Sequence, residues 1–158
     1  MNTKDFVDDI KKYLKEKVVS LDSNFRDLDT YTAYTYEHTP KAPEIDVYVV
    51  DDTDDTNSNS YEEGENITNI SLYIYCYAEA MKLNNDTEKT NAVDVSTLLA
   101  DRVKEAMLKN NLYNNNKNVI SVEKVSYTGS TNVRDTVLYV AIYRYDIKVL
   151  NNYIKIYR

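Results

Sequence analysis

The alternation of apolar and polar residues is most regular between Ile70 and Glu79. Even positions carry Ile, Leu, Ile, Cys and Ala, whereas odd positions carry Ser, three tyrosines and Glu. Side chains of a strand alternate between its two faces, so the pattern predicts a strand with one apolar and one tyrosine-rich face. The apolar face needs a cover, and amphipathic segments on both sides of it in the sequence can supply one.

Apolar residues at three- and four-residue steps predict two helices. The first spans residues 4–19 with Thr3 as its N-cap, and the second runs from Thr90 or Asn91 to about Lys109. Alternation predicts further strands over residues 30–38, 44–51, 119–127 and 133–150, with a turn at 128–130. A hairpin at Asn151-Asn152, or a single bent strand there, would complete the chain.

The order of these elements predicts an α+β fold. We expect a largely antiparallel sheet of four to six strands with both helices packed on one face. The 158 residues suit a single domain, 1–158, that can bury a core without disulfides or metal.

Residues 51–66 are rich in aspartate and glutamate and nearly devoid of apolar side chains. Such a segment buries too little surface to offset its ordering entropy, so we expect a long mobile loop that a partner orders. Calcium is the alternative, but an EF-hand needs glycine where Thr56 stands and helices on both sides. The predicted partner-binding residues are Asp51, Asp52, Asp54, Asp55, Tyr61 and Glu62.

Charge and composition argue against several functions. The net charge of −7 would repel nucleic acid, whose binding needs basic patches, and two glycines exclude a Gly-rich phosphate loop. The single cysteine, Cys76, falls on the apolar face and is expected to be buried without a disulfide. The charged N-terminus and the lack of a long apolar run predict neither a signal peptide nor a membrane span.

His38 is the only histidine in the chain. One His and one Cys cannot form a His/Cys zinc site, and no nucleophile stands in a recognisable setting for His38 to activate. We therefore interpret His38 as a surface or packing residue and expect no enzyme activity, no cofactor and no metal site.

Six tyrosines of two strands are the predicted subunit interface. Tyrosine combines an apolar ring with a polar tip and so suits a surface that is wet before assembly. Core packing is the second interpretation, and stacking on nucleic-acid bases, which needs surrounding basic charge, is the third. The six are Tyr73, Tyr75, Tyr77, Tyr139, Tyr143 and Tyr145.

The order of elements and the closing segment resemble the tail terminators of tailed bacteriophages. The likeness lies in an N-terminal helix, a strand reaching a polar loop, the strand at 70–78 and the helix at 92–109. Residues 132–139 (NVRDTVLY), 143–147 (YRYDI) and 156–158 (IYR) look like the ending of small terminator or tail-completion proteins from phages of low-GC hosts.

This resemblance implies a structural protein of the virion that is assembled in the host cytoplasm. It implies a ring, hexameric in the family, that caps the tail tube and joins the tail to the head at the tail–neck junction. Its partners would be further copies of itself, the tail tube and possibly the sheath, and neck or connector proteins. Genomic DNA would pass through an acidic lumen without specific binding.

Other functions stay open at this point. A head–tail connector, neck or minor tail component has similar size and composition. An immunity- or antitoxin-like protein would bind a basic partner through the acidic loop. A small hydrolase that uses His38 is the enzyme alternative.

Overall fold

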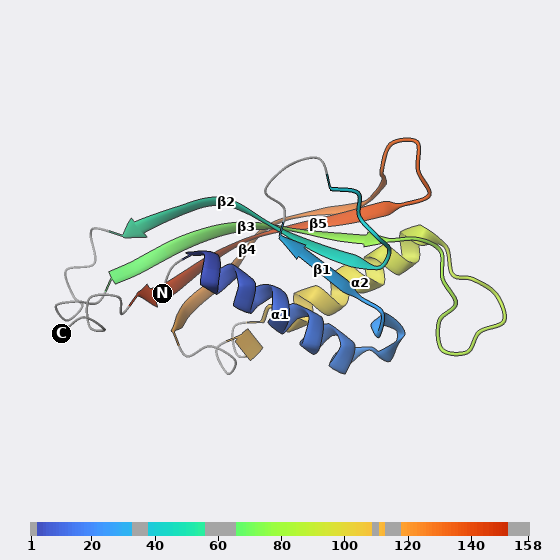
Figure 1. Ribbon diagram of the computed structural model, residues 1–158, viewed down its shortest axis with the longest axis horizontal. Coiled ribbons are helices and arrows are strands. Elements are labelled where there is room, and N and C mark those ends of the chain that lie inside the picture. Colours follow the sequence, from blue (N-terminus) through green and yellow to red (C-terminus); the bar gives the residue numbers. More distant parts are fainter. Residues whose placement is uncertain (1–2, 33–37, 56–65, 109–110, 113–117, 152–158) are drawn as a thin grey trace.

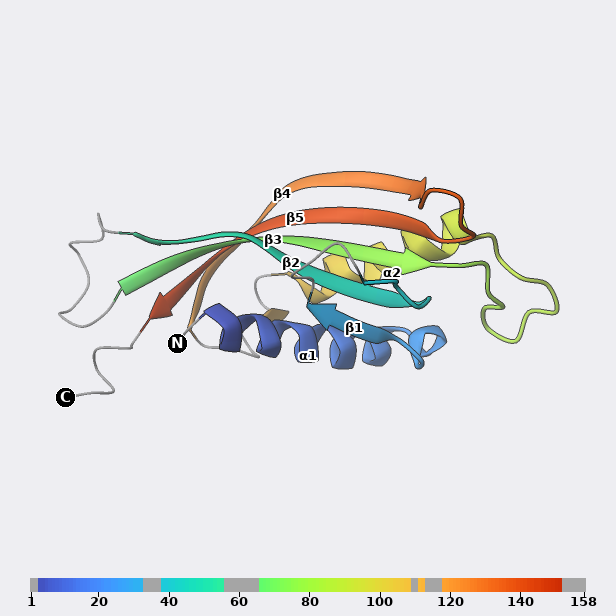
Figure 2. The same ribbon diagram turned by 45° about the horizontal axis from the view of Figure 1, so that its top comes forward.

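A computed structural model of the chain describes residues 3–32, 38–55, 66–108, 111–112 and 118–151. It consists of one twisted five-stranded sheet with two helices packed on the same face (Figures 1 and 2). In Figure 2, the N-terminal helix lies below the sheet and the second helix passes behind its central strands. Residues of both helices pack in one core with the same sheet face, and no helix of the described residues covers the other face. The predicted α+β fold is confirmed.

The sheet has the strand order β1-β2-β3-β5-β4. Neighbouring strands are antiparallel except for β1, which runs parallel to β2 at one edge. The strands are β1 (Asp29–Thr32), β2 (Glu44–Asp55), β3 (Asn66–Ala78), β4 (Val119–Asn132) and β5 (Tyr139–Asn151). The strand predicted from the Ile70–Glu79 alternation is therefore the centre of the sheet.

The helices are α1 (Thr3–Leu21) and α2 (Ala92–Ala106), with a short 3₁₀ turn, η1 (Ser23–Phe25), after α1. Asn91 caps α2, because its side chain accepts a hydrogen bond of 2.9 Å from the backbone N–H of Asp94. Thr3 already lies inside α1 and not before it, a difference of one residue from the expected cap.

The core fills the space between the two helices and the face of β3 that carries its even-numbered residues. Leu72, Ile74 and Cys76 are fully buried there, as are Leu14 of α1 and Leu99 of α2. The burial of Cys76 as a free thiol was predicted and is confirmed. Apolar area removed from water on this one face is the main source of stability, since the other face carries polar and tyrosine side chains.

Both ends of the acidic segment 51–66 belong to strands and not to a loop, since β2 extends to Asp55 and β3 begins at Asn66. Residues 51–55 continue β2 and pair with β3, from Asp51 opposite Ser71 to Asp55 opposite Ile67. Strand pairing satisfies the backbone N–H and C=O groups whatever the side chains are, and β3 provides a neighbouring strand with which these residues pair. The polar composition of residues 51–55 therefore did not predict their structure. Tyr61 and Glu62 lie outside the described residues.

The C-terminal half differs from the expectation of one long strand. β4 passes through Gly129 to Asn132, and the chain turns at 133–138 before β5 begins. The turn closes with a 2.9 Å hydrogen bond from Val133 N–H to the Leu138 carbonyl, and Asp135 adopts a positive φ of 57°. In place of the turn expected at 128–130, the pairing of β4 with β5 shifts register between Thr128 and Thr131, which is a β-bulge within a continuous strand.

Two other predicted features end at the limits of the described residues. β1 covers only the beginning of the strand expected at 30–38, because 33–37 lie outside the description. The hairpin expected at Asn151-Asn152 also falls outside it. No helix among the described residues is long and apolar enough to cross a membrane.

Candidate functional site: the open face of the sheet

The face of the sheet opposite the helices, called the open face below, carries most of the chain's candidate chemistry. Strand register decides which side chains share it, because directly opposed residues point to the same side. Asp46 opposes Tyr31 on one side and Tyr75 on the other, and Tyr75 opposes Ile142. The open face includes Tyr31, Glu44, Asp46, Tyr48, Tyr73, Tyr75, Tyr77, Ile142, Arg144 and Asp146.

Tyr73, Tyr75 and Tyr77 form a row along the centre of the open face. Their ring centroids are 6.0 Å apart for the first pair and 6.2 Å for the second, within the range of favourable aromatic contacts. Each is partly buried. The Arg144 guanidinium carbon lies 5.8 Å from the centre of the Tyr73 ring, a cation–π arrangement between β5 and β3.

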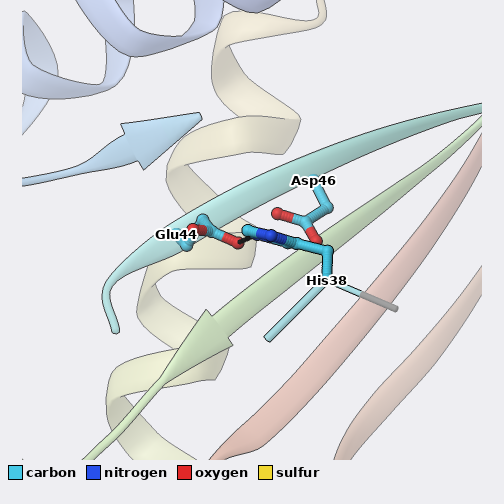
Figure 3. A group of neighbouring side chains, drawn as sticks. All are labelled: His38, Glu44 and Asp46. Atoms are coloured by element: carbon cyan, nitrogen blue, oxygen red, sulfur yellow. Dashed lines mark hydrogen bonds and ion pairs between the residues drawn. The ribbon is translucent and has the colours of Figure 1, made fainter. Parts of the chain in front are cut away.

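A polar cluster lies at the β1 end of the open face, where His38 meets the first residues of β2 (Figure 3). His38 Nε2 and Glu44 Oε2 are 2.8 Å apart, and the backbone N–H of Lys41 donates to Glu44 Oε1 at 3.3 Å. The imidazole stacks on the Tyr31 ring with centroids 3.6 Å apart. Glu44 and Asp46 are 3% and 4% exposed, so two carboxyl groups are buried side by side.

Burial dominates the electrostatics of this cluster. Burial, followed by hydrogen bonding to Glu44 and the charge of Glu44, together raise the pKa of Asp46 to about 9. Two buried carboxyls this close cannot both ionise cheaply, so in the protein alone Asp46 keeps its proton at neutral pH. Burial also raises the pKa of Tyr77, with smaller contributions from Asp46 and Tyr75.

The predicted tyrosine interface divides between two faces. Tyr73, Tyr75 and Tyr77 lie on the open face, but Tyr143 and Tyr145 are each 3% exposed and belong to the core. Leu72 opposes Tyr145 and Ile74 opposes Tyr143, so odd positions of β5 share a face with even positions of β3. The assignment of these two residues to a subunit interface is corrected to core packing, the second interpretation.

Tyr139 and the acidic residues lie elsewhere in the sheet. Tyr139 begins β5 on the helix side and is partly buried. Asp51 is exposed on β2, and the backbones of Asp52, Asp54 and Asp55 follow it along that strand. These four residues lie toward the end of β2 opposite the His38 cluster, so the two acidic regions are separate.

One local sequence pattern indicates part of the polar cluster. Glu44 and Asp46 are two residues apart in a predicted strand and therefore share a face. What the pattern could not show is that His38 and Tyr31 come back to that same face, since this depends on the path of the chain between β1 and β2.

Comparisons with known proteins give little guidance on function. No protein-family model matches the chain, and no curated protein matches it. Among solved structures, a chain from the "Virion of native gene transfer agent (GTA) particle" is similar, with a TM-score of 0.44 and 9% identity over 77% of this chain and 78% of that one. At that TM-score we draw nothing from the likeness about what this chain does.

Proposed function

We propose that this chain is a structural protein of a phage-like virion, and specifically a tail terminator that assembles into a ring on the end of the tail tube. The proposal joins the sequence resemblance to one structural observation. That observation is an open sheet face lined by a row of tyrosines and covered by no helix of the described chain.

The open face suits contact with another subunit. Tyr48, Tyr73, Tyr75 and Tyr77 present rings with polar tips, and Ile142 of β5 adds an apolar side chain between them. Interfaces that form from soluble subunits are enriched in tyrosine for this reason. A ring requires a head-to-tail contact, in which this face meets a different surface of the next subunit.

The exposed edge of the sheet supplies a second surface. β4 pairs only with β5 among the described strands, and its residues from Glu123 to Gly129 are exposed. Its irregular pairing with β5 shifts register three times, which discourages random edge-to-edge association while leaving room for a specific partner.

The charge of the chain fits passage of DNA through a ring. With 26 acidic and 19 basic residues, the subunit carries a net charge of −7, and a lumen of this sign lets DNA slide without specific binding. In this proposal, the acidic end of β2 that begins at Asp51 contacts the tail tube, the sheath or a neck protein.

Electron microscopy and gene deletion test the proposal together. Purified protein should form rings of uniform diameter in negative stain, and antibody labelling should mark one end of the tails. Deletion of the gene should give tails of uncontrolled length that do not join heads. Tails of normal length already joined to heads in the deletion strain would overturn the proposal.

The same experiments separate the alternatives. A neck or connector component predicts tails of normal length that remain unjoined to heads. An immunity- or antitoxin-like protein predicts a monomer that forms a 1:1 complex with a basic partner and has no effect on tails.

A further inference from the structure

Three potential metal ligands converge at the β1 end of the open face (Figure 3). His38 Nε2, a Glu44 carboxylate oxygen and an Asp46 carboxylate oxygen all lie within 4.8 Å of one another. Glu44 and Asp46 come from consecutive outward positions of β2, while His38 comes from the segment before it. An ion bound at about 2.0–2.2 Å from each ligand would need only small side-chain rotations to meet all three.

An unsatisfied buried atom points to a ligand at this position. Asp46 is 4% exposed, and its Oδ1 has no hydrogen-bond partner among the described residues. A buried carboxylate oxygen without a donor is costly and needs an explanation, such as a proton or an ion. In Figure 3, the Asp46 carboxyl group lies beside the His38 ring, and Nε2 of the same ring is hydrogen-bonded to Glu44.

The imidazole is also held in a fixed orientation. The Tyr31 ring stacks on it with an angle of only 10° between the planes, which keeps Nε2 directed at the two carboxyl groups. Side chains that are already held in place lose little entropy on binding an ion.

We propose that His38, Glu44 and Asp46 bind one divalent transition-metal ion, with Zn²⁺ as the best fit. One imidazole nitrogen and two carboxylate oxygens suit zinc, whereas Mg²⁺ and Ca²⁺ prefer shells made only of oxygen. Three protein ligands leave a coordination position for water or for a group from a neighbouring molecule. On binding, the ion would displace the Asp46 proton to solvent, satisfy Asp46 Oδ1 and neutralise the two carboxylates.

The bound ion would cross-link two segments of the chain on the open face. His38 lies before the turn that leads into β2, so the ion would tie that segment to β2 beside Tyr75 and Tyr77. This inference goes beyond the proposed function and stands independently of it, since a monomer or a ring could carry the same site.

Untagged protein gives a direct test, because His38 is the only histidine of the chain. After dialysis against Zn²⁺ and removal of free metal, elemental analysis should find one zinc per chain. The single histidine signal in the proton NMR spectrum should shift at one equivalent of Zn²⁺, and zinc should block carbethoxylation of His38. A tenfold excess of Mg²⁺ should not compete.

Variants assign the ligands. His38→Gln and Asp46→Asn should each lower the Zn²⁺ affinity about tenfold or more and abolish the zinc-dependent rise in Tm. Glu123→Gln is the matched control, because this carboxylate is exposed on β4 at the far edge of the sheet and should bind zinc as the natural chain does.

Two results would overturn the proposal. One is unchanged zinc affinity in both ligand variants, which would place any bound ion elsewhere. The other, which needs no variant, is natural protein whose histidine signal and Tm do not respond to Zn²⁺ or Co²⁺. In that case the buried carboxyl pair is satisfied by a shared proton alone.

Discussion

Tyr13 shows how a single polar atom joins two elements of this fold. Its ring is buried in the core, and its hydroxyl donates a 2.7 Å hydrogen bond to the carbonyl of Ala106, at the last turn of α2. The helix end would otherwise hold an unsatisfied carbonyl beneath the sheet. One phenol therefore satisfies the end of α2 and fixes its distance from α1.

Replacement of Tyr13 by Phe should lower the free energy of unfolding by about 1 kcal/mol, because the ring still packs while the hydrogen bond is lost. Urea denaturation monitored by circular dichroism measures the difference. Tyr48→Phe, a partly exposed tyrosine of the open face, is the control and should change stability by less than about 0.5 kcal/mol. Equal losses in both variants would contradict this role of Tyr13.

Stability should fall in alkaline solution as buried tyrosines ionise. Burial raises the pKa of Tyr13 to about 12 and that of Tyr143 to about 12, against a value of 10.0 in the unfolded chain. The folded state therefore favours the neutral phenols, so this contribution is complete below pH 10 and is lost as the pH rises toward 12. Urea midpoints from pH 8 to pH 12 should decline above pH 10, and less steeply in Tyr13→Phe.

Tyrosines of the two sheet faces should respond differently to truncation. Tyr143→Ala removes a buried ring that stacks on Tyr127 and lies tilted against Tyr145, and should cost about 3 kcal/mol or more. Tyr73→Ala removes a partly exposed ring and should cost about 1 kcal/mol. Urea denaturation measures the loss in free energy of unfolding for each variant. Equal losses would contradict the assignment of Tyr143 to the core and of Tyr73 to the open face.

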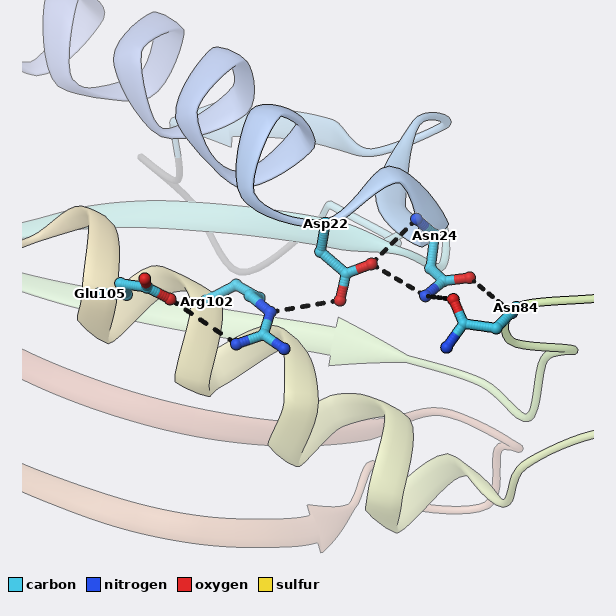
Figure 4. Close-up of polar contacts among 5 residues, drawn as sticks. All are labelled: Asp22, Asn24, Asn84, Arg102 and Glu105. Atoms are coloured by element: carbon cyan, nitrogen blue, oxygen red, sulfur yellow. Dashed lines mark hydrogen bonds and ion pairs between the residues drawn. The ribbon is translucent and has the colours of Figure 1, made fainter.

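At the scale of elements, a polar network fastens the end of α1 to α2 and to the loop after β3 (Figure 4). Arg102 Nε of α2 lies 3.2 Å from Asp22 Oδ2, and Asp22 Oδ1 accepts a 3.0 Å hydrogen bond from the Asn24 backbone to cap η1. Asn24 and Asn84 then exchange two hydrogen bonds of 2.9 Å. The helices are thus aligned by a few polar contacts in addition to their apolar faces.

A double-mutant cycle on Asp22 and Arg102 measures one link of this network. Asp22→Ala should cost more than Arg102→Ala, because it also removes the cap of η1. The coupling energy should be about 0.5–1 kcal/mol, since Asp22 is largely buried while Arg102 stays partly exposed. Added salt should reduce it, and a coupling of zero would mean that the ion pair does not align the helices.

At the scale of the whole molecule, one sheet face is committed to the core and the other remains available. Among the described residues, both helices pack on the same side of the sheet, so the tyrosine row and the polar cluster share a face that neither helix covers. This separation allows changes on the open face that spare folding, which makes assembly testable by mutation.

Replacement of Tyr48 and Tyr73 together by Ser should abolish ring formation while the Tm stays within a few degrees of the natural chain. These residues oppose each other at the middle of the open face, so their loss removes the centre of the proposed interface. Sedimentation velocity measures the assembly. Val93→Ser on α2, whose exposed side chain belongs to neither proposed surface, is the control. Loss of rings in that variant alone would contradict an interface on the open face.

Local patterns in the sequence determined much of the secondary structure. The apolar stripes of α1 and α2, the Asn91 cap and the alternation of β3 depend on neighbours three, four or two residues apart, which any stretch of sequence displays. These were enough to place both helices on one face of a largely antiparallel sheet. The central role of the strand at Ile70–Glu79 and the burial of Cys76 followed from the same alternation.

Only the tertiary structure decided which strands pair and in which register. Alternation in β5 shows that Tyr143 and Tyr145 share a face, but not that this face lies with Leu72 and Ile74 in the core. Likewise, the polar residues from Asp51 onward form a strand because β3 pairs with them, and His38 reaches Asp46 only because the chain returns to β2. Such contacts join residues distant in the sequence, and local periodicity carries no information about them.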